Sequence, residues 1–554
     1  MGPVGQHSDK RAVRSVTACW HDPAPSKCFA TSNDNCSILA FSKKTIYSRE
    51  RNGNNQNKLH IRQEKEFHIR ATEGINIMAC TMLRPEHAHS WLDNAIRVAP
   101  LRLSDSWRKQ QVEAALCKVQ LTGAKVLRIK EVFHSEMERG IHQQPSSLQM
   151  ENTYIPELPD GTEEGLFLAL DLGGTNFRVI LLELANGVVI RQHVKHYHIG
   201  EELRLGCGER LFDFLAECVS DFVRSQNLNG TRLPLGFTFS FPMIQKGLDV
   251  GILLTWTKSF NCPSVVGRDA VQMLREAINR RGDSHVEVLA VLNDTAGTLI
   301  QGAVLDKRTA IGLILGTGSN ACYMERADRV QHWEGQRHGE KQVIIDIEWG
   351  AFGDNGVLDF IKTDYDRKVD DNSLITNSFT FEKYISGKYL GEIVRVVLVK
   401  LVEDCVLFGG TASDTLLTSG AFTTSLVSLI EQDTVDNSCD NTSEILNKLG
   451  LSYDADDIAV VKFVCETVSN RAALLVSICT AVLLERLDRP DTTIAVDGSL
   501  YTYHPRLKSW MNKYIRLLAP GKKFRLLLAE DGSGKGAGLV AAIAVRLKQR
   551  FSET

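Results

Sequence analysis

Asn293 and Asp294 have side chains and a position in the chain that suggest chemistry. They follow the apolar residues 290–292, which predict the end of a buried strand. Ligands of open α/β sheets bind at such strand ends, so the carboxylate of Asp294 has two interpretations. It either caps the next helix or acts as a base, and for a lone Asp at this position the cap is the commoner role.

Two glycine-rich segments are candidates for binding phosphate through closely approaching backbone and hydroxyl donors. Residues 171–176 separate the apolar runs 166–170 and 177–184, which predicts a strand, a tight turn and a strand. Residues 316–320 repeat this arrangement between the apolar runs 310–315 and 321–324. The recurrence predicts an internally duplicated protein whose two turns face a shared cleft. Arg178 would add a charged donor to the first turn, although a surface ion pair is the alternative role for it.

A third glycine cluster, residues 532–536, lies between the apolar run 524–528 and the helical pattern 537–547. A strand, a glycine turn and a helix would place backbone N–H groups where an anion is stabilised. The segment is not a Walker A loop, because Lys535 is followed by Gly536 rather than by Ser or Thr. It matches the dinucleotide-binding fingerprint poorly, because no later strand completes a βαβ unit.

The elements that position these residues belong to a large globular α/β chain of 554 residues, 43% of them hydrophobic and 24% charged. The 64 basic and 67 acidic residues nearly balance, so no overall field attracts nucleic acid or an anionic membrane. The 13 cysteines form no CxxC pair, which favours reduced thiols in an intracellular protein over a zinc site or a disulfide framework. The apolar stretch 472–484 is shorter than the ~20 residues that span a membrane, and it predicts a buried helix.

Residues 1–100 are rich in Asn, Ser, His and basic residues and have almost no apolar periodicity, which predicts a disordered extension. From Trp107 onward the apolar spacing is typical of a helix.

Nine ordered segments between residues 107 and 550 resemble those of eukaryotic hexokinases. They are LFLALDLGGTNFRV, LGFTFSFP, TWTKSF, VLNDTAGT, LGTGSNACYMER, EWGAFGD, FEKYISGKYLGE, AVDGSLYTYHP and EDGSGKGAGLV. The resemblance implies a single hexokinase unit with an N-terminal extension. It implies an α/β, two-lobed actin-like ATPase fold, ribonuclease H-like and duplicated, with a cleft between a small and a large domain. We expect the extension at 1–100, a helical part of the large domain at 101–160, the small domain at 161–294 and the large domain at 295–550, with the C-terminal helix as a candidate to return to the small domain.

The resemblance also implies an ATP-dependent hexokinase that phosphorylates the 6-hydroxyl of glucose and related hexoses at the entry to glycolysis. Asp294 resembles the catalytic carboxylate that takes the proton of this hydroxyl, and Lys258 resembles the group that stabilises the transferring phosphoryl. The hexose ligands implied are Ser240, Thr257, Lys258, Asn293, Asp294, Asn320, Glu348 and Glu382. Carboxylates and amides suit a polyol, because each hydroxyl both donates and accepts.

The nucleotide contacts follow from the same resemblance. They are Asp171, Gly173, Gly174, Thr175, Asn176 and Arg178 in the first loop, Gly316, Thr317 and Gly318 in the second, and Lys388, Thr418, Asp497, Gly498 and Ser499 near the triphosphate and adenosine. Mg²⁺ is expected on the ATP phosphates and water, without a protein metal cage. We further expect a monomer without nucleic-acid partners or a transmembrane segment, in the cytoplasm, with mitochondrial association as the alternative location.

Three positions depart from the family pattern and are expected to alter affinity or rate. Ser259 replaces a Gly, Asp346 replaces an Asn and adds a negative charge near the hexose, and Phe379 replaces a Gln. These changes keep open a catalytically weakened, glucose-binding sensor or regulatory protein. Retention of both Asp294 and Lys258 favours the enzyme over this alternative. An actin-like chaperone or filament protein would share the fold but would not need the TWTKSF segment.

Overall fold

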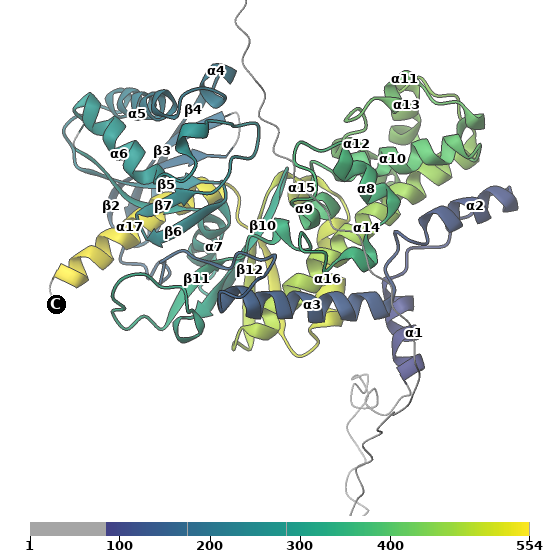
Figure 1. Ribbon diagram of the computed structural model, residues 1–554, viewed down its shortest axis with the longest axis horizontal. Coiled ribbons are helices and arrows are strands. Elements are labelled where there is room, and N and C mark those ends of the chain that lie inside the picture. The colour runs from purple at the N-terminus through teal and green to yellow at the C-terminus, as the bar shows by residue number, and fades with distance from the viewer. Residues whose placement is uncertain (1–84, 174–175, 284, 553–554) are drawn as a thin grey trace, which may run out of the picture. The chain divides into compact units, whose positions relative to one another are not determined.

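Figure 1 shows the computed structural model of the chain, which describes residues 85–173, 176–283 and 285–552. Gly174 and Thr175, two of the expected nucleotide contacts, lie outside the described residues, as does segment 1–84 of the expected extension.

The strands form a five-stranded sheet, a six-stranded sheet and a two-stranded hairpin. They are β1 (Glu151–Asn152), β2 (Gly165–Leu172), β3 (Asn176–Ala185), β4 (Val188–His198), β5 (Leu233–Phe239), β6 (Met243–Gly247), β7 (Val250–Leu253), β8 (Val286–Leu292), β9 (Thr309–Leu315), β10 (Ser319–Arg326), β11 (Gln342–Asp346), β12 (Asp491–Asp497) and β13 (Lys523–Leu528).

The helices cover these sheets and connect them. They are α1 (Pro85–Ile96), α2 (Ser106–Leu116), α3 (Gly123–Ile141), α4 (Glu201–Arg204), α5 (Gly208–Ser225), α6 (Ala270–Arg281), α7 (Asp294–Leu305), α8 (Asp364–Asp371), α9 (Thr380–Ile385), α10 (Leu390–Glu403), α11 (Asp414–Leu417), α12 (Thr424–Asp436), α13 (Asp440–Lys448), α14 (Ala455–Arg486), α15 (Ser499–Tyr503), α16 (Leu507–Leu518) and α17 (Gly532–Ser552). Short 3₁₀ turns lie at η2 (Pro263–Val265), η3 (Ala327–Arg329), η4 (Trp349–Ala351), η5 (Asp359–Ile361) and η6 (Phe408–Gly410).

Helix α1 lies inside the segment 1–100 that the sequence predicted to be disordered. Its residues Leu92 and Ile96 are buried four positions apart on one face, and Val98 and Leu101 continue this apolar surface. The helix packs against α3. The prediction of disorder is therefore wrong for residues 85–100, because a short amphipathic pattern there was hidden by the polar composition of the segment as a whole.

The two larger sheets have the same topology. In the five-stranded sheet the order is β4-β3-β2-β5-β8, and in the six-stranded sheet it is β11-β10-β9-β12-β13 with β1 added beside β11. In each sheet three antiparallel strands in chain order are followed by two strands parallel to the first. The internal duplication predicted from the two glycine hairpins, now β2–β3 and β9–β10, is confirmed by this repeated order.

Helices α7 and α17 pack against each other at glycine residues and link the two sheets. Helix α7 contacts β9 and β12 of the six-stranded sheet, whereas α17 lies along β2 and β5 of the five-stranded sheet (Figure 1). A side chain at Gly536 of α17 would clash with the backbone of Gly297 in α7. Because α17 begins at Gly532, the glycines of 532–536 lie inside its first turns. The prediction of a glycine turn before the helix is therefore wrong. They serve close helix packing, which a local sequence pattern cannot distinguish from a loop.

Helix α14 contains the apolar stretch 472–484 and packs against α3, α10, α12 and α16. Its residues from Ala472 to Leu484 are buried, as the sequence predicted. Among the described residues it is the one helix long and apolar enough to span a membrane, and its apolar window is fully buried inside the protein.

We predict that Gly536→Ala lowers the free energy of unfolding by about 2 kcal/mol, because the added methyl group overpacks the contact between α7 and α17. This cost exceeds the ~1 kcal/mol that Ala gains over Gly in a helix interior. The matched control is Gly521→Ala, since no heavy atom lies within 4 Å of a methyl group there. Urea unfolding measures both variants, and equal stabilities would contradict the packing role of Gly536.

Candidate active site

Asn293 and Asp294 follow the end of β8, as the sequence predicted. The helix cap, one of the two roles considered for Asp294, belongs to Asn293 instead. Asn293 is the N-cap of α7, and its side-chain oxygen accepts a hydrogen bond from the Thr295 backbone N–H at 3.1 Å. Asp294 is the first residue of the helix, so its carboxylate lies in the favourable field of the helix N-terminus. Because Asn293 provides the cap, the carboxylate of Asp294 remains available for chemistry.

The loop that carries Lys258 is anchored by aromatic side chains on either side of it. Trp256 and Phe260 are buried and stacked, with ring centroids 5.3 Å apart, and both contact Phe241. The Trp256 indole N–H donates to the Cys262 carbonyl at 2.8 Å. Between these anchors Lys258 adopts a φ of 55°, in the left-handed region that non-glycine residues rarely occupy. The anchors therefore hold the lysine at a sharp turn.

Lys258 and Asp294 meet at the junction of these two segments. The Lys258 Nζ lies 3.8 Å from Asp294 Oδ2, and the two side chains are 34% and 19% exposed, so solvent reaches both. Burial raises the pKa of the Asp294 carboxyl, the charge of Lys258 opposes this shift, and Asp171 adds to it. The nearby hydroxyl of Ser240 also opposes the rise in the pKa of Asp294. A carboxylate with a raised pKa is a stronger base than an ordinary Asp.

The other expected hexose ligands surround this pair. Asn293 Nδ2 donates to Glu348 Oε1 at 3.0 Å, and Glu348 itself adopts a left-handed φ of 54° just before η4. The side-chain oxygen of Asn320 accepts from the Ala321 N–H at 2.7 Å. Glu382 Oε2 accepts from the Ser319 N–H at 3.0 Å, and burial raises the pKa of Glu382 against the opposing charges of two lysines. Thr257 lies in the Lys258 loop, where its carbonyl accepts from the Phe260 N–H at 3.1 Å.

Asp346 lies at the end of β11, inside this cluster, and is 5% exposed. Its Oδ1 accepts from Asn320 Nδ2 at 2.8 Å and from Thr295 Oγ1 at 3.3 Å. Its carboxyl is also hydrogen-bonded to that of Glu348. Burial and the charge of Asp294 raise the pKa of Asp346 to about 7. A proton held by this pair of carboxyl groups would offset the extra negative charge expected at position 346.

The first expected phosphate loop is joined to the start of α17 by ion pairs. Arg178 pairs with Asp171 on β2, and its Nη1 lies 2.6 Å from Asp531 Oδ1. Ser533 Oγ donates to Asp171 Oδ2 at 3.0 Å. Arg178 is thus held in a largely buried network instead of a surface pair, because its side chain is 24% exposed. Gly173 borders this network, with Ser240 Oγ 3.7 Å from the position of a methyl group there. Asn176 begins β3.

The second loop contacts two other predicted nucleotide segments. The carbonyls of Gly316 and Thr317 accept from the N–H groups of Gly387 and Lys388 at 2.8 and 3.1 Å. The Gly316 N–H in turn donates to the Gly318 carbonyl at 3.0 Å. Gly498 has a φ of 116°, and a side chain there would meet the Leu315 carbonyl, so the turn at 497–499 lies against this loop. This site requires glycine for both reasons.

Asp497 and Thr418 have different surroundings. Asp497 Oδ2 accepts from the Gly532 N–H at 2.9 Å, which joins β12 to the start of α17, and Ser499 begins α15. Burial raises the pKa of Asp497. The hydroxyl of Thr418 donates to the Asp414 carbonyl in α11 at 2.8 Å. Among the described residues, the hydrogen bonds of Thr418 stay within this helical part of the chain.

Two of the departures from the family pattern occupy strained backbone positions. Ser259 has a φ of 70°, directly after Lys258, and Phe379 has a φ of 55° at the N-cap of α9. Phe379 has no capping side chain, and Asp354 accepts the N–H groups of Phe379 and Thr380 at 2.9 and 2.8 Å instead. Asp354 therefore holds the backbone of Phe379 in a left-handed conformation that residues with a side chain rarely adopt.

Sequence reasoning missed three residues that contribute to the site. Thr295 bridges Asn293 and Asp346 through its hydroxyl, Asp531 holds Arg178, and Ser533 reaches Asp171. Thr295 and Ser533 lie within the quoted segments VLNDTAGT and EDGSGKGAGLV, as does Asp531. The pairings of Asp531 and Ser533 join positions 353 and 362 residues apart, and Thr295 reaches Asp346, 51 positions away, which no local pattern specifies.

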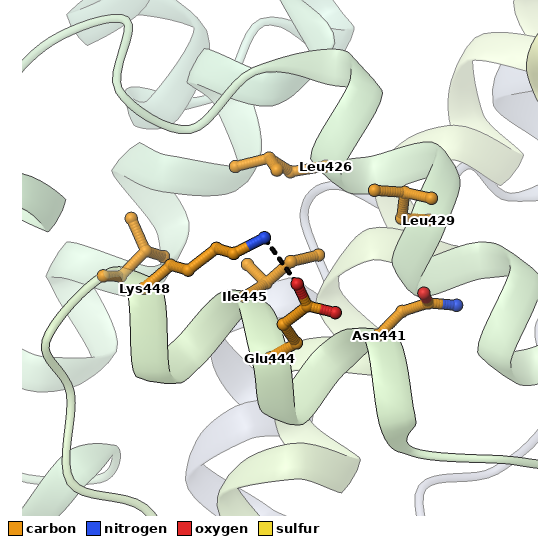
Figure 2. A pocket seen from close by; sticks show the side chains of 7 residues that line it. Leu426, Leu429, Asn441, Glu444, Ile445 and Lys448 are labelled. Carbon is orange, nitrogen blue, oxygen red and sulfur yellow. Dashed lines mark ion pairs between the residues drawn. The ribbon is translucent and has the colours of Figure 1, made fainter.

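Two small recesses lie among helices outside this cluster. One of about 110 Å³ is bordered by Leu426 and Leu429 of α12 and by residues of α13, and Figure 2 shows the Lys448–Glu444 ion pair along α13 at its edge. The other, of about 180 Å³, lies between α1 and α14. Within the described ranges, no group of three or more His, Cys, Asp or Glu side chains is arranged to hold a metal ion.

Comparisons with known proteins agree with this geometry. Hexokinase family models match residues 111–304 and 310–543. The chain is 45% identical over 462 residues to Hexokinase-1 of Homo sapiens, covering 81% of this chain and 50% of that protein. It is 41% identical over 502 residues to Hexokinase-1 of Mus musculus, covering 89% and 51%. The chain thus spans about half the length of the curated relatives it matches.

The structure is similar to a solved hexokinase from Schistosoma mansoni in complex with glucose. The TM-score is 0.74 at 37% identity, with 80% of this chain and 100% of that chain covered. A second hexokinase crystal structure has a TM-score of 0.69 at 30% identity, with 79% and 100% covered. Together with the repeated strand order, these likenesses confirm the expected two-lobed actin-like ATPase fold.

We predict that Arg178→Met lowers the free energy of unfolding by about 2 kcal/mol, because it leaves the largely buried Asp171 without its charged partner. The matched control is Arg191→Met, which removes an exposed pair with Glu183 on neighbouring strands. This control is expected to cost less than about 1 kcal/mol. Equal losses of unfolding free energy in the two variants, measured by denaturant unfolding, would show that the Arg178 network stabilises the protein no more than a surface pair.

Proposed function

This chain belongs to the hexokinase family, and on that basis we propose that it transfers the γ-phosphoryl group of ATP to the 6-hydroxyl of glucose and related hexoses. The observation that carries the proposal is the Lys258–Asp294 pair, 3.8 Å apart and open to solvent, among amide and carboxyl side chains that suit a polyol. The activity is a proposal for this chain because it spans about half of its curated relatives.

Asp294 accepts the proton of the hexose 6-hydroxyl in this mechanism. The hydroxyl oxygen forms a bond to the γ-phosphorus while the bond from that phosphorus to the bridging oxygen of ADP breaks. The proton passes to the Asp294 carboxylate, whose pKa is raised by burial. The raised pKa makes this carboxylate a better proton acceptor than an ordinary Asp. The proton transfer is needed late in the step, because phosphoryl transfer depends chiefly on positioning and charge.

Lys258 stabilises the phosphoryl group as negative charge develops on its oxygens. Its side chain is 34% exposed, and Nζ lies over the ring of Phe241, 5.9 Å from the ring centroid. Because the ion pair to Asp294 is not a close hydrogen bond, Nζ can turn toward a phosphate at small cost. The strained turn at 258–259 fixes the backbone while the side chain moves.

The hexose ligands are expected to act through their hydrogen-bonding capacity. Asn293 and Asn320 are held by backbone N–H groups. Glu348 accepts from Asn293 and Glu382 accepts from the Ser319 N–H, and both carboxyl groups keep further acceptor positions. A buried hexose hydroxyl left without a partner costs about 1–3 kcal/mol, so this set favours a ligand with several hydroxyls.

The nucleotide is expected at the two glycine loops. The turn at 497–499 lies against Gly316, and the Lys388 N–H donates to the Thr317 carbonyl, so two glycine-rich turns and a lysine lie next to one another. These groups fit a polyphosphate. Mg²⁺ bound with ATP would neutralise part of the phosphate charge, and Asp171 and Asp497 are the nearby carboxylates that could orient its water shell.

We predict that Asp294→Ala lowers kcat about 10²- to 10⁴-fold with glucose and Mg-ATP, because the base is lost. Wild-type kcat should fall as the pH drops through the raised pKa of Asp294, since the protonated acid cannot accept the hydroxyl proton. The assay is initial-rate formation of glucose 6-phosphate by the purified chain. The control Asp328→Ala changes an exposed carboxylate paired with Arg326 and should leave kcat unchanged.

The same assay separates the enzyme from the sensor. Wild-type protein that binds glucose but forms no more product than Asp294→Ala would contradict the proposal and favour the glucose-binding sensor. The cytoplasmic location and the monomeric state expected from the sequence stay predictions.

A further inference from the structure

We propose that Asp346 is a positioning residue for the hexose: it shares a proton with Glu348, and the loss of this proton weakens glucose binding as the pH rises. The inference rests on the proposed function, because it takes Glu348 as a hexose ligand. It concerns the affinity for the sugar and leaves the role of Asp294 in phosphoryl transfer unchanged.

The contact between Asp346 and Glu348 requires a proton. Their carboxyl groups are hydrogen-bonded to each other, and a carboxylate has no hydrogen to donate. Asp346 is 5% exposed, so water cannot mediate freely between the two groups. Asp346 Oδ1 already accepts from Asn320 and Thr295, which favours the charge on Asp346 and the shared proton on Glu348.

The same contact orients Glu348. Its backbone has a left-handed φ of 54°, and Asn293 Nδ2 donates to its Oε1 at 3.0 Å. Asn293 is itself fixed as the N-cap of α7. Glu348 is therefore held by Asn293 on one side and by Asp346 on the other, and loss of either contact would free the side chain to rotate.

The charges around the pair are mostly negative. Asp294 faces it from the start of α7, and Glu151 is the cross-strand neighbour of Asp346 on β1, with His332 Nε2 3.8 Å from Glu151 Oε1. Glu334 acts on Glu151 from the same side. The Cys322 thiol is the opposite cross-strand neighbour, on β10, and burial raises its pKa, which keeps it neutral. Lys258 is the nearby cation that acts on Glu348.

The direction of the pH effect follows from these charges. Burial and Asp294 raise the pKa of Asp346 to about 7, and burial with Asp346 raises the pKa of Glu348 well above its usual range. Below these values the pair retains a proton and the contact is attractive. Each proton lost on raising the pH adds a negative charge beside Asp294, so the carboxyl groups repel and Glu348 loses its fixed orientation. Glucose affinity should therefore fall with rising pH.

The test is the pH dependence of glucose binding, measured without nucleotide by tryptophan fluorescence or calorimetry from pH ~6.5 to ~8.5. For the wild type, the loss of one linked proton predicts a rise in Kd of about tenfold per pH unit above the pKa of the pair. In Asp346→Asn the amide N–H donates to Glu348 and does not titrate, so Kd should change by less than about twofold. Asp346→Ser also offers a hydrogen-bond donor that does not titrate, and it should show the same small change in Kd. It serves as the test variant if Asp346→Asn does not fold.

Glu151→Gln is the matched control. Glu151 is a second buried carboxyl next to Asp346, and burial raises its pKa to about 7 as well, but its hydrogen bonds run to the Gln245 N–H and Gln149. This variant should keep a pH-dependent Kd, because the contact between Asp346 and Glu348 is intact. A flat wild-type profile, or a profile that Glu151→Gln flattens and Asp346→Asn does not, would overturn the role of Asp346 while the proposed function stands. Absence of glucose binding by the wild type at every pH would overturn both.

Discussion

The structure must keep several carboxyl groups together at a site that is only partly open to solvent. Asp294, Asp346, Glu348 and Glu382 converge beside Lys258, and burial is the leading cause of the raised pKa in each of the four acids. Charges of one sign in such a place are tolerated only when donors or protons offset them. The donors here are the Asn293 and Asn320 amides, the Thr295 hydroxyl and the Ser319 N–H, while the Asp346–Glu348 contact uses a proton instead. Each acid of the site therefore has a neighbour that offsets its charge, and Lys258 acts on Asp294, Glu348 and Glu382.

The close contact of α7 with α17 decides where these acids lie. Glycine at 297 and 536 lets the two helix backbones approach, and this brings the start of α17 next to the start of α7. The start of α17 then holds the first loop, because Ser533 donates to Asp171, and it holds β12, because the Gly532 N–H donates to Asp497. The two glycines at this helix contact thus bring residues of both duplicated halves to one place.

Local patterns predicted much of the fold and part of the site. Two hairpins, the duplication, the buried helix α14 and the strand end before Asp294 all follow from apolar periodicity and glycine position. Helix α1 was missed because the polar composition of its surroundings masked four apolar residues, and the glycines of α17 were misread as a turn because their partner, Gly297, lies in another helix. The contact between Asp346 and Glu348 could not be predicted either. The sequence places the two acids two residues apart, and only the fold shows that their carboxyl groups meet.

Lys258 links the electrostatics of the resting site to the chemistry proposed for it. In the resting arrangement its charge partly offsets the effect of burial on Asp294 and so lowers the proton affinity of the carboxylate. When the ammonium group turns toward a phosphoryl group, that offset weakens, and burial with the charge of Asp171 dominates the pKa of Asp294. The proton affinity of the base then rises as the phosphoryl group draws the lysine away, which is when the hexose hydroxyl gives up its proton. The strained turn at 258–259 contributes by holding the lysine backbone between Trp256 and Phe260, so that movement of the side chain alone makes the change.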